Sequence, residues 1–265
     1  MPGDASIAAA GTVTAIDGDR LWAFGHPFLG GGSARLPLAR ASVVAVMPSQ
    51  AVSFKMFSVG EMLGELTADR AHGIGGRLGP APAMVPVAVE VDGRGYRFAV
   101  PRHPTLLPLL VAYLTQSSHS ARGRTFGDQT VAMAVEMAYA GGRTALLEDV
   151  FAGPEAPFEA AGLAAAVVAF LENSSHQPPD LERMTIRLTS TEEVDAARIL
   201  EVVPSRAVVR PGDTLDVKVR IQPFRGEAEW LRLSVPVPDR VAAVGQLDLV
   251  VADGASWSAY ELRAR

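Results

Sequence analysis

Short segments in which apolar and polar residues alternate recur through most of this 265-residue chain, and this period of two constrains its fold more than any other feature. Over residues 10–100 they are separated by turns rich in Gly and Pro; they include Ser42–Met47, Ala51–Phe57, Val85–Val91 and Tyr96–Val100. Asp17-Gly18 and Asp92-Gly93 each stand between two such runs, a pattern typical of β-hairpins. We therefore expect short antiparallel strands in a barrel or a sandwich.

The period changes between residues 102 and 180. Pro104–Ser117 predicts a mostly buried helix, and Thr130–Ala140 returns to alternation. Pro157–Asn173 predicts an alanine-rich helix. Its apolar run is interrupted by Glu159 and is shorter than the roughly 20 residues that a membrane-spanning helix needs, so we expect no membrane span.

From residue 181 to residue 265 the sequence again predicts short strands, with Arg-Pro-Gly-Asp at 210–213 as a turn between two of them. The predicted strands are Met184–Leu188, Ala197–Val203, Thr214–Ile221, Glu229–Val235, Gln246–Val251 and Ser256–Leu262. Their spacing favours a small antiparallel β-sandwich, immunoglobulin-like in shape. The sequence thus predicts a mainly β protein with inserted helices: a β-barrel part over 1–101, an α+β insert with two helices over 102–180, and a β-sandwich over 181–265.

Composition excludes several classes of function. A net charge of −5 without a basic cluster argues against a nucleic-acid partner. The chain has no cysteine, and its five histidines are scattered without a His-x-x-x-His spacing, so we expect neither a metal site nor a cofactor. The first residues, Met1–Asp4, lack the basic and apolar regions of a signal peptide.

His26 is the principal candidate for a functional residue. The first predicted hairpin ends in Gly25-His26-Pro27, which places an imidazole where the chain leaves a strand. A histidine held there by a rigid sheet can act as a general base. The alternative interpretation is a structural histidine that makes hydrogen bonds at a strand end.

The segment Gly11–Gly32 resembles the histidine-containing segment of the stage IV sporulation protein B (SpoIVB) family of serine peptidases. The resemblance is to long bacterial envelope proteins with a SpoIVB peptidase domain, and it covers roughly the first 100 residues. It continues through Met47–Gln50, Val59–Gly64 and Thr67–Ile74. The resemblance implies a trypsin-like barrel, proteolysis of an envelope protein or peptide, His26 as general base, and a periplasmic or secreted location.

Members of that family carry their nucleophile in a Gly-x-Ser-Gly-Ser-Pro-like turn, and the 265 residues contain no such segment. Ser33 and Ser256 lack the second glycine, while Ser49 and Ser53 lie in what the sequence predicts to be a strand connection. A serine hydroxyl needs an adjacent base to become nucleophilic, so His26 has no identified partner. We therefore expect the chain to be the C-terminal, histidine-bearing part of such a protein, associating with an N-terminal half that carries the serine.

Asp69 is the candidate orienting partner of His26, by analogy with other base–carboxylate pairs. It lies beside Arg70 and His72, and the alternative interpretation is a surface Asp–Arg pair next to a glycine-rich turn. Two functions therefore remain open for the whole chain. One is a SpoIVB-like serine endopeptidase domain, or its histidine-bearing part; the other is a non-catalytic envelope module that binds protein partners or serves as a scaffold.

Overall fold

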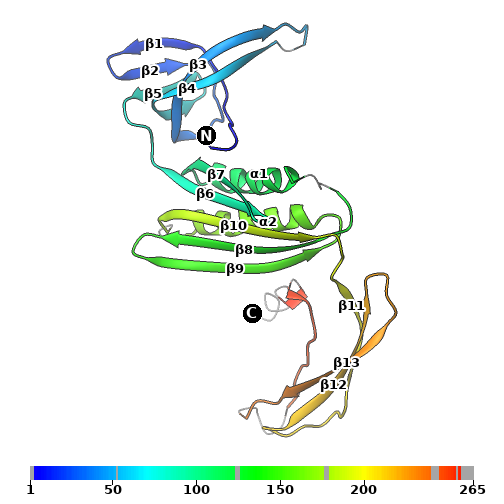
Figure 1. Ribbon diagram of the computed structural model, residues 1–265. Helices are drawn as coiled ribbons and strands as arrows, with labels where there is room; N and C mark the ends of the chain where they lie inside the picture. Colours follow the sequence, from blue (N-terminus) through cyan, green and yellow to red (C-terminus); the bar gives the residue numbers. More distant parts are fainter. Residues whose placement is uncertain are drawn as a thin grey trace. The chain divides into compact units, whose positions relative to one another are not determined.

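The computed structural model describes residues 3–51, 53–122, 126–175, 179–239, 245–254, 256 and 257. The protein is mainly β with two inserted helices of 15 and 17 residues, as the sequence predicts (Figure 1). It divides into two compact units, Met1–Glu192 and Glu193–Arg265. Over the described ranges its strands form three sheets, and none of the three closes into a barrel.

The N-terminal sheet is antiparallel throughout, with the strand order β1-β2-β5-β4-β3. Its strands are β1 (Val13–Asp17), β2 (Arg20–Ala23), β3 (Gly32–Met47), β4 (Phe54–Arg70) and β5 (Gly73–Leu78). A small apolar cluster that includes Leu21, Leu36, Leu66 and Ile74 holds its central part together. The segment of β5 was predicted as a glycine-rich turn because glycines carry no apolar side chains that would reveal a strand.

The turn of the first hairpin differs by one residue from the predicted one. Asp17 pairs with Arg20, so the two central residues are Gly18 and Asp19. Gly18 has a φ of 58°, which a type II′ turn requires at its first central position. The second predicted hairpin is confirmed: Asp92 and Gly93 both have positive φ, as a type I′ turn requires.

The middle sheet has the order β7-β6-β10-β8-β9, with β6 and β10 parallel and every other pair antiparallel. Its strands are β6 (Met84–Val91), β7 (Arg94–Pro101), β8 (Thr130–Tyr139), β9 (Arg143–Ala152) and β10 (Leu181–Thr191). Helices α1 (Leu106–Ser120) and α2 (Ala156–Glu172) lie against it and against each other (Figure 1). The two helices confirm the predicted helical segments, whereas β9 was not predicted.

The largest core of the protein lies between this sheet and the two helices. Val85, Val87, Val89 and Val91 of β6 are at most 1% exposed, because alternate residues of a strand share one face. Leu107, Val111 and Leu114 of α1 recur at helical spacing and are fully buried in the same core. Burying one such side chain contributes about 1.5–3 kcal/mol, so this core stabilises much of the first unit.

Three segments lie in a different sheet from the one predicted. Val85–Val91 and Tyr96–Val100, assigned to the barrel part over 1–101, belong to the middle sheet as β6 and β7. Met184–Leu188, assigned to the sandwich over 181–265, is the centre of the same sheet as β10. Alternation identifies a strand, but it does not say which neighbour the strand pairs with.

The second unit contains a three-stranded antiparallel sheet of β11 (Ala197–Pro204), β12 (Thr214–Pro223) and β13 (Glu229–Pro236). Its buried apolar residues include Val217 and Val219 of the central strand. Gln246–Val251 was predicted as a strand, but it is not one in the structure. The last predicted strand, Ser256–Leu262, begins with a helical turn at Ser256 and Trp257, and residues 258–262 lie outside the described residues.

Candidate functional site

His26 lies in the segment that leaves β2, and the backbone before it is in an uncommon conformation. Phe24 has a φ of 77° and Gly25 a φ of 73°, so the chain turns sharply at the end of the strand. A positive φ is unusual for a bulky residue and costs about 1–3 kcal/mol; such strain is concentrated at functional sites. A hydrogen bond of 3.0 Å from the Phe24 N–H to the Thr12 carbonyl oxygen supports this conformation.

The segment after His26, which we call the His26 loop (residues 25–31), is held by the carboxylate of Asp69. Asp69 stands at the end of β4 and is only 3% exposed. It accepts main-chain hydrogen bonds from Phe28 at 2.7 Å, from Leu29 at 2.6 Å and from Gly31 at 3.3 Å. Charge-assisted bonds of this kind are among the strongest in proteins, so Asp69 fixes the backbone of the loop.

The same contacts determine the charge of Asp69. Burial alone would raise the pKa of this carboxyl group, but the N–H groups of Leu29, Phe28, Gly31 and Gly30 favour its ionised form. The net result is a pKa below the ordinary value for aspartate. Asp69 is therefore a buried anion near neutral pH, neutralised by backbone dipoles.

The imidazole of His26 is exposed, and its Nδ1 lies 2.7 Å from the carbonyl oxygen of Pro27. A carbonyl oxygen only accepts hydrogen bonds, so Nδ1 is the donor and carries a proton. In the neutral ring Nε2 then has the free lone pair, which is the requirement for a general base. The ring also lies 5.6 Å from the ring of Phe24, centroid to centroid.

The structure thus brings His26 and Asp69 to the same loop, but in a relation that differs from a base–carboxylate pair. The Asp69 oxygens accept hydrogen bonds from the main chain after His26, and the imidazole is oriented by Pro27. Asp69 therefore positions the loop as a whole. It acts on the imidazole only through the backbone.

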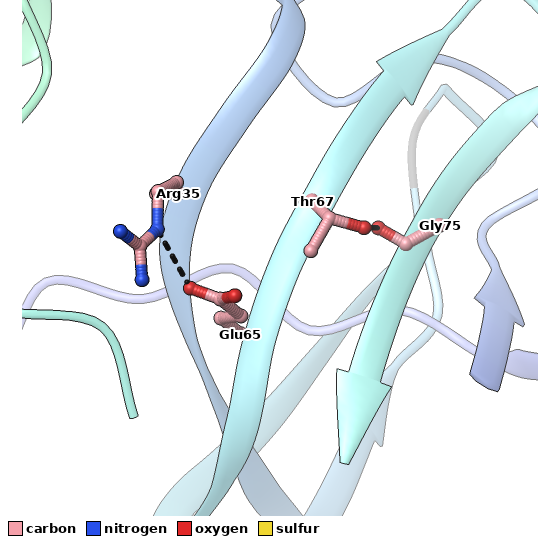
Figure 2. A network of polar contacts seen from close by, with 4 residues as sticks. All are labelled: Arg35, Glu65, Thr67 and Gly75. Atoms are coloured by element: carbon pink, nitrogen blue, oxygen red, sulfur yellow. Dashed lines mark hydrogen bonds and ion pairs between the residues drawn. The ribbon is translucent and has the colours of Figure 1, made fainter. Parts of the chain in front are cut away.

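Strand β4, which carries Asp69, is joined to its two neighbours by side-chain contacts as well as by main-chain hydrogen bonds. Arg35 of β3 forms an ion pair of 3.0 Å with Glu65 of β4, and Thr67 of β4 donates to the Gly75 carbonyl oxygen of β5 at 3.4 Å (Figure 2). These contacts join β4 to both of its neighbouring strands near Asp69. They help to fix the position of the strand end from which Asp69 holds the His26 loop.

The remaining predicted candidates lie apart from one another or have structural contacts. Ser49 and Ser53 bond to each other at the tip of the β3–β4 hairpin, where the Ser53 hydroxyl accepts from the Ser49 N–H at 3.1 Å. Ser256 donates to the carboxylate of Asp253 in the second unit. Ser33 is exposed at the start of β3, and His72 is exposed in the β4–β5 turn.

His103 was not singled out from the sequence, yet it lies against the His26 loop. A Cβ atom added at Gly31 would lie 3.7 Å from the Nε2 of His103. The Nδ1 of His103 accepts the N–H groups of Thr105 and Leu106 at the start of α1, so in the neutral ring its Nε2 is a donor. No sequence pattern links residues 31 and 103, because the contact depends on how the sheets pack.

Comparisons with protein-family models, with curated proteins and with solved structures found no match to this chain. Among the residues that the structure describes, no group of three histidine, aspartate or glutamate side chains is arranged to hold a metal ion. In the same part of the chain, no helix has the length and apolar character needed to cross a membrane.

Proposed function

We propose that the N-terminal region is the histidine-bearing part of a SpoIVB-like serine endopeptidase domain that acts on envelope proteins, in the periplasm or outside the cell. His26 is its general base. The serine lies in a segment that the 265 residues do not include. In this proposal the five strands β1–β5 are part of a trypsin-like barrel, and the C-terminal sheet is one face of an immunoglobulin-like sandwich.

The observation that carries the proposal is the way the His26 loop is held. A buried, ionised Asp69 accepts several N–H groups of the loop, while the imidazole itself stays exposed. A structural histidine at a strand end would be expected to make its bonds within the sheet. A rigid loop that presents a free Nε2 is instead the arrangement that proton transfer to and from a substrate requires.

The proposal is tested first in the DNA that precedes the coding sequence. We expect it to encode a Gly-x-Ser-Gly-Ser-Pro segment, in the same reading frame or in an adjacent one. The chain joined to that segment should cleave an unfolded protein such as casein. His26→Ala should abolish cleavage, whereas His72→Ala, which removes another exposed histidine of the same sheet, should leave it intact. Undiminished cleavage by the His26→Ala variant, or no such segment, would contradict the proposal.

A second candidate function is the non-catalytic binding module, and a specific surface favours it. The outer half of the β3–β4 hairpin, residues 41–47 and 54–59, forms what we call the apolar arm; Lys55 is its single charged residue. Val44 is 74% exposed and Phe54 is 58% exposed. Pairing of β4 with β5 begins only at Gly64, so the arm is a two-stranded ribbon with unusually apolar faces.

In this second reading the arm pairs with another protein strand, and a second copy of the chain is the occupant that can be tested directly. Sedimentation velocity should show concentration-dependent association of the wild-type chain. Val44→Lys combined with Phe54→Lys should give a monomer, while Leu146→Lys, at a similarly exposed position on β9, should not. A wild-type chain that stays monomeric would contradict this reading.

A further inference from the structure

A second cluster of polar side chains lies at one end of the middle sheet, away from the His26 loop. A hollow of about 150 Å³ opens there, and Asp92, His119, Arg122 and Ser190 are among the residues that line it. They come from three places: the β6–β7 turn, the last residues of α1 and those just after it, and the end of β10. None of them has a role in the function proposed above.

The sheet topology brings these residues together. Strands β6 and β10 are parallel, so both carboxyl ends reach the same edge of the sheet. Asp92 continues this pairing beyond β6: its N–H donates to the Leu188 carbonyl oxygen at 3.0 Å, and its Oδ1 accepts the Ser190 N–H at 2.8 Å. The carboxyl ends of parallel strands are where open sheets most often bind ligands.

His119 and Ser190 form the central contact of the cluster. The Nε2 of His119 lies 3.1 Å from the Ser190 Oγ, within the range of a nucleophile and its base. The imidazole is 3% exposed, and its Nδ1 has no hydrogen-bond partner among the described residues. Ser190 is half-buried and lines the hollow. A buried base therefore lies next to an accessible hydroxyl in this cluster, whereas no serine of the chain has been assigned as the partner of His26.

The charges around the imidazole favour its neutral form. Burial lowers the pKa of His119, and the nearby carboxylate of Asp92 opposes this only in part, so the net pKa lies below the ordinary value for histidine. Arg122 and Glu192 also line the hollow, and the C-terminal end of α1 adds a partial negative charge. With its proton on Nδ1, the neutral ring can accept the hydroxyl proton of Ser190 at Nε2.

We propose that Ser190 and His119 are a nucleophile–base pair that hydrolyses esters of short acyl groups. The Ser190 Oγ bonds to the acyl carbon as its proton passes to His119 Nε2; the ester C–O bond breaks, and His119 returns that proton to the leaving alcohol. Water then attacks the acyl-serine, giving one proton to His119 and thence to the Ser190 Oγ, and the carboxylic acid is released. The guanidinium of Arg122 stabilises the oxyanion. The hollow is smaller than the roughly 300–1,000 Å³ of sites for drug-sized ligands, which restricts the acyl group to a short one.

The full chain is incubated with a fluorophosphonate probe, and the adduct is mapped by peptide mass spectrometry. We expect one stoichiometric adduct on Ser190. Hydrolysis of p-nitrophenyl acetate should be faster than that of p-nitrophenyl octanoate. Ser190→Ala should abolish both signals, and His119→Gln should lower both by about 10²–10⁴-fold. Ser118→Ala, which removes a buried hydroxyl that has no hydrogen-bond partner next to His119, is the matched control and should retain them.

A second variant tests the role of Asp92 as a positioning residue. Asn accepts the positive φ of 48° at this position and can still accept the Ser190 N–H, so Asp92→Asn removes only the charge. The pKa of His119 should fall, and the acid limb of the pH–rate profile should move to lower pH. The proposal is overturned if the folded chain gives no adduct, or if the adduct maps to another serine. It is also overturned if ester hydrolysis survives in Ser190→Ala. An adduct on another serine that His26→Ala removes would overturn this proposal and would also place the nucleophile served by His26 within this chain, against the proposal that its serine lies elsewhere.

Discussion

At the scale of single residues, the contacts of Asp69 decide whether the His26 loop is ordered. Its carboxylate is buried and accepts hydrogen bonds from three N–H groups of the loop at 2.6–3.3 Å. These donors are not part of any sheet ladder, and they would be left without their acceptor if Asp69 were removed. An unsatisfied buried polar group costs more than the net value of the bond that it replaces.

We therefore expect Asp69→Ala to destabilise the chain by about 2–3 kcal/mol in urea unfolding. The amides of Phe28 and Leu29 should also lose their protection from hydrogen exchange. Asp19→Ala is the matched control on the same sheet, because Asp19 is exposed and lies 3.7 Å from Arg77. An exposed pair of this kind contributes at most about 1 kcal/mol. Equal losses in both variants would show that Asp69 has no special role.

The pKa of Asp69 predicts a dependence of stability on pH. Its pKa is lowered in the folded chain, so the unfolded chain binds a proton more readily. The stabilisation is therefore present above the ordinary aspartate pKa of about 4, and it is lost as the pH falls below that value towards the folded pKa. Thermal unfolding between pH 7 and pH 2 should show this loss in the wild-type chain. The slope below pH 4 should be smaller in Asp69→Asn, and an unchanged slope would argue against the ionised state.

The sequence indicates His26 and Asp69 as candidates, because turn residues and nearby motif residues can be recognised locally. It could not show that Asp69 binds the backbone after His26, since that depends on a register between β3 and β4 some 40 residues apart. The pair of His119 and Ser190 is separated by 71 residues and follows no motif, so no local pattern indicates it.

At the scale of elements, the junction between the apolar arm and the sheet depends on Gly64. Here β4 begins to pair with β5, and Gly64 has a φ of 153°. A Cβ at this position would lie 1.9 Å from the Arg77 carbonyl oxygen, which no side-chain movement can relieve because the neighbour is backbone. The two strands approach each other this closely only because residue 64 has no side chain.

Gly64→Ala should therefore separate β4 from β5 locally and cost about 3 kcal/mol or more. Gly60→Ala is the matched control in the same strand. Its Cβ would meet the Arg40 carbonyl oxygen at 3.4 Å, an ordinary contact, and its φ is not positive. Denaturant unfolding of the two variants should differ by at least about 2 kcal/mol. Similar midpoints would mean that the sheet adjusts at Gly64 without strain.

Helices and strands were predictable where their apolar side chains recur with a regular period. The two helices and strands such as β6 were found within a few residues of their bounds, because burial on one face leaves a period in the sequence. The long strands β3 and β4 were predicted only in part, as Ser42–Met47 and Ala51–Phe57. The strand β5 was not predicted because three of its first four positions, Gly73, Gly75 and Gly76, carry no apolar side chain. The pairing of strands was harder to predict than the strands themselves. Strand β10 was predicted, but its place between β6 and β8 depends on contacts across nearly 100 residues.

At the scale of the whole molecule, the chain consists of two units that divide between Glu192 and Glu193. The sequence predicted a boundary at residue 181, where the strand-rich C-terminal part begins. The difference arises because β10 completes the core of the first unit: Met184, Ile186 and Leu188 are at most 2% exposed within it. A strand in the middle of a sheet cannot be removed without exposing both of its neighbours, so the first unit has to extend through β10.

This division predicts the outcome of limited proteolysis. Glu192 and Glu193 are exposed between β10 and β11, in a segment outside either sheet, so a glutamate-specific protease should cleave there first. Mass spectrometry should identify a fragment ending at residue 192 or 193. That fragment should keep a cooperative thermal transition, because it contains the whole core between the middle sheet and its helices. Glu192→Gln combined with Glu193→Gln should slow this cut and no other. Early cleavage at Glu182, within β10, would instead place the boundary near the predicted one and would show that β10 opens more easily than its burial implies.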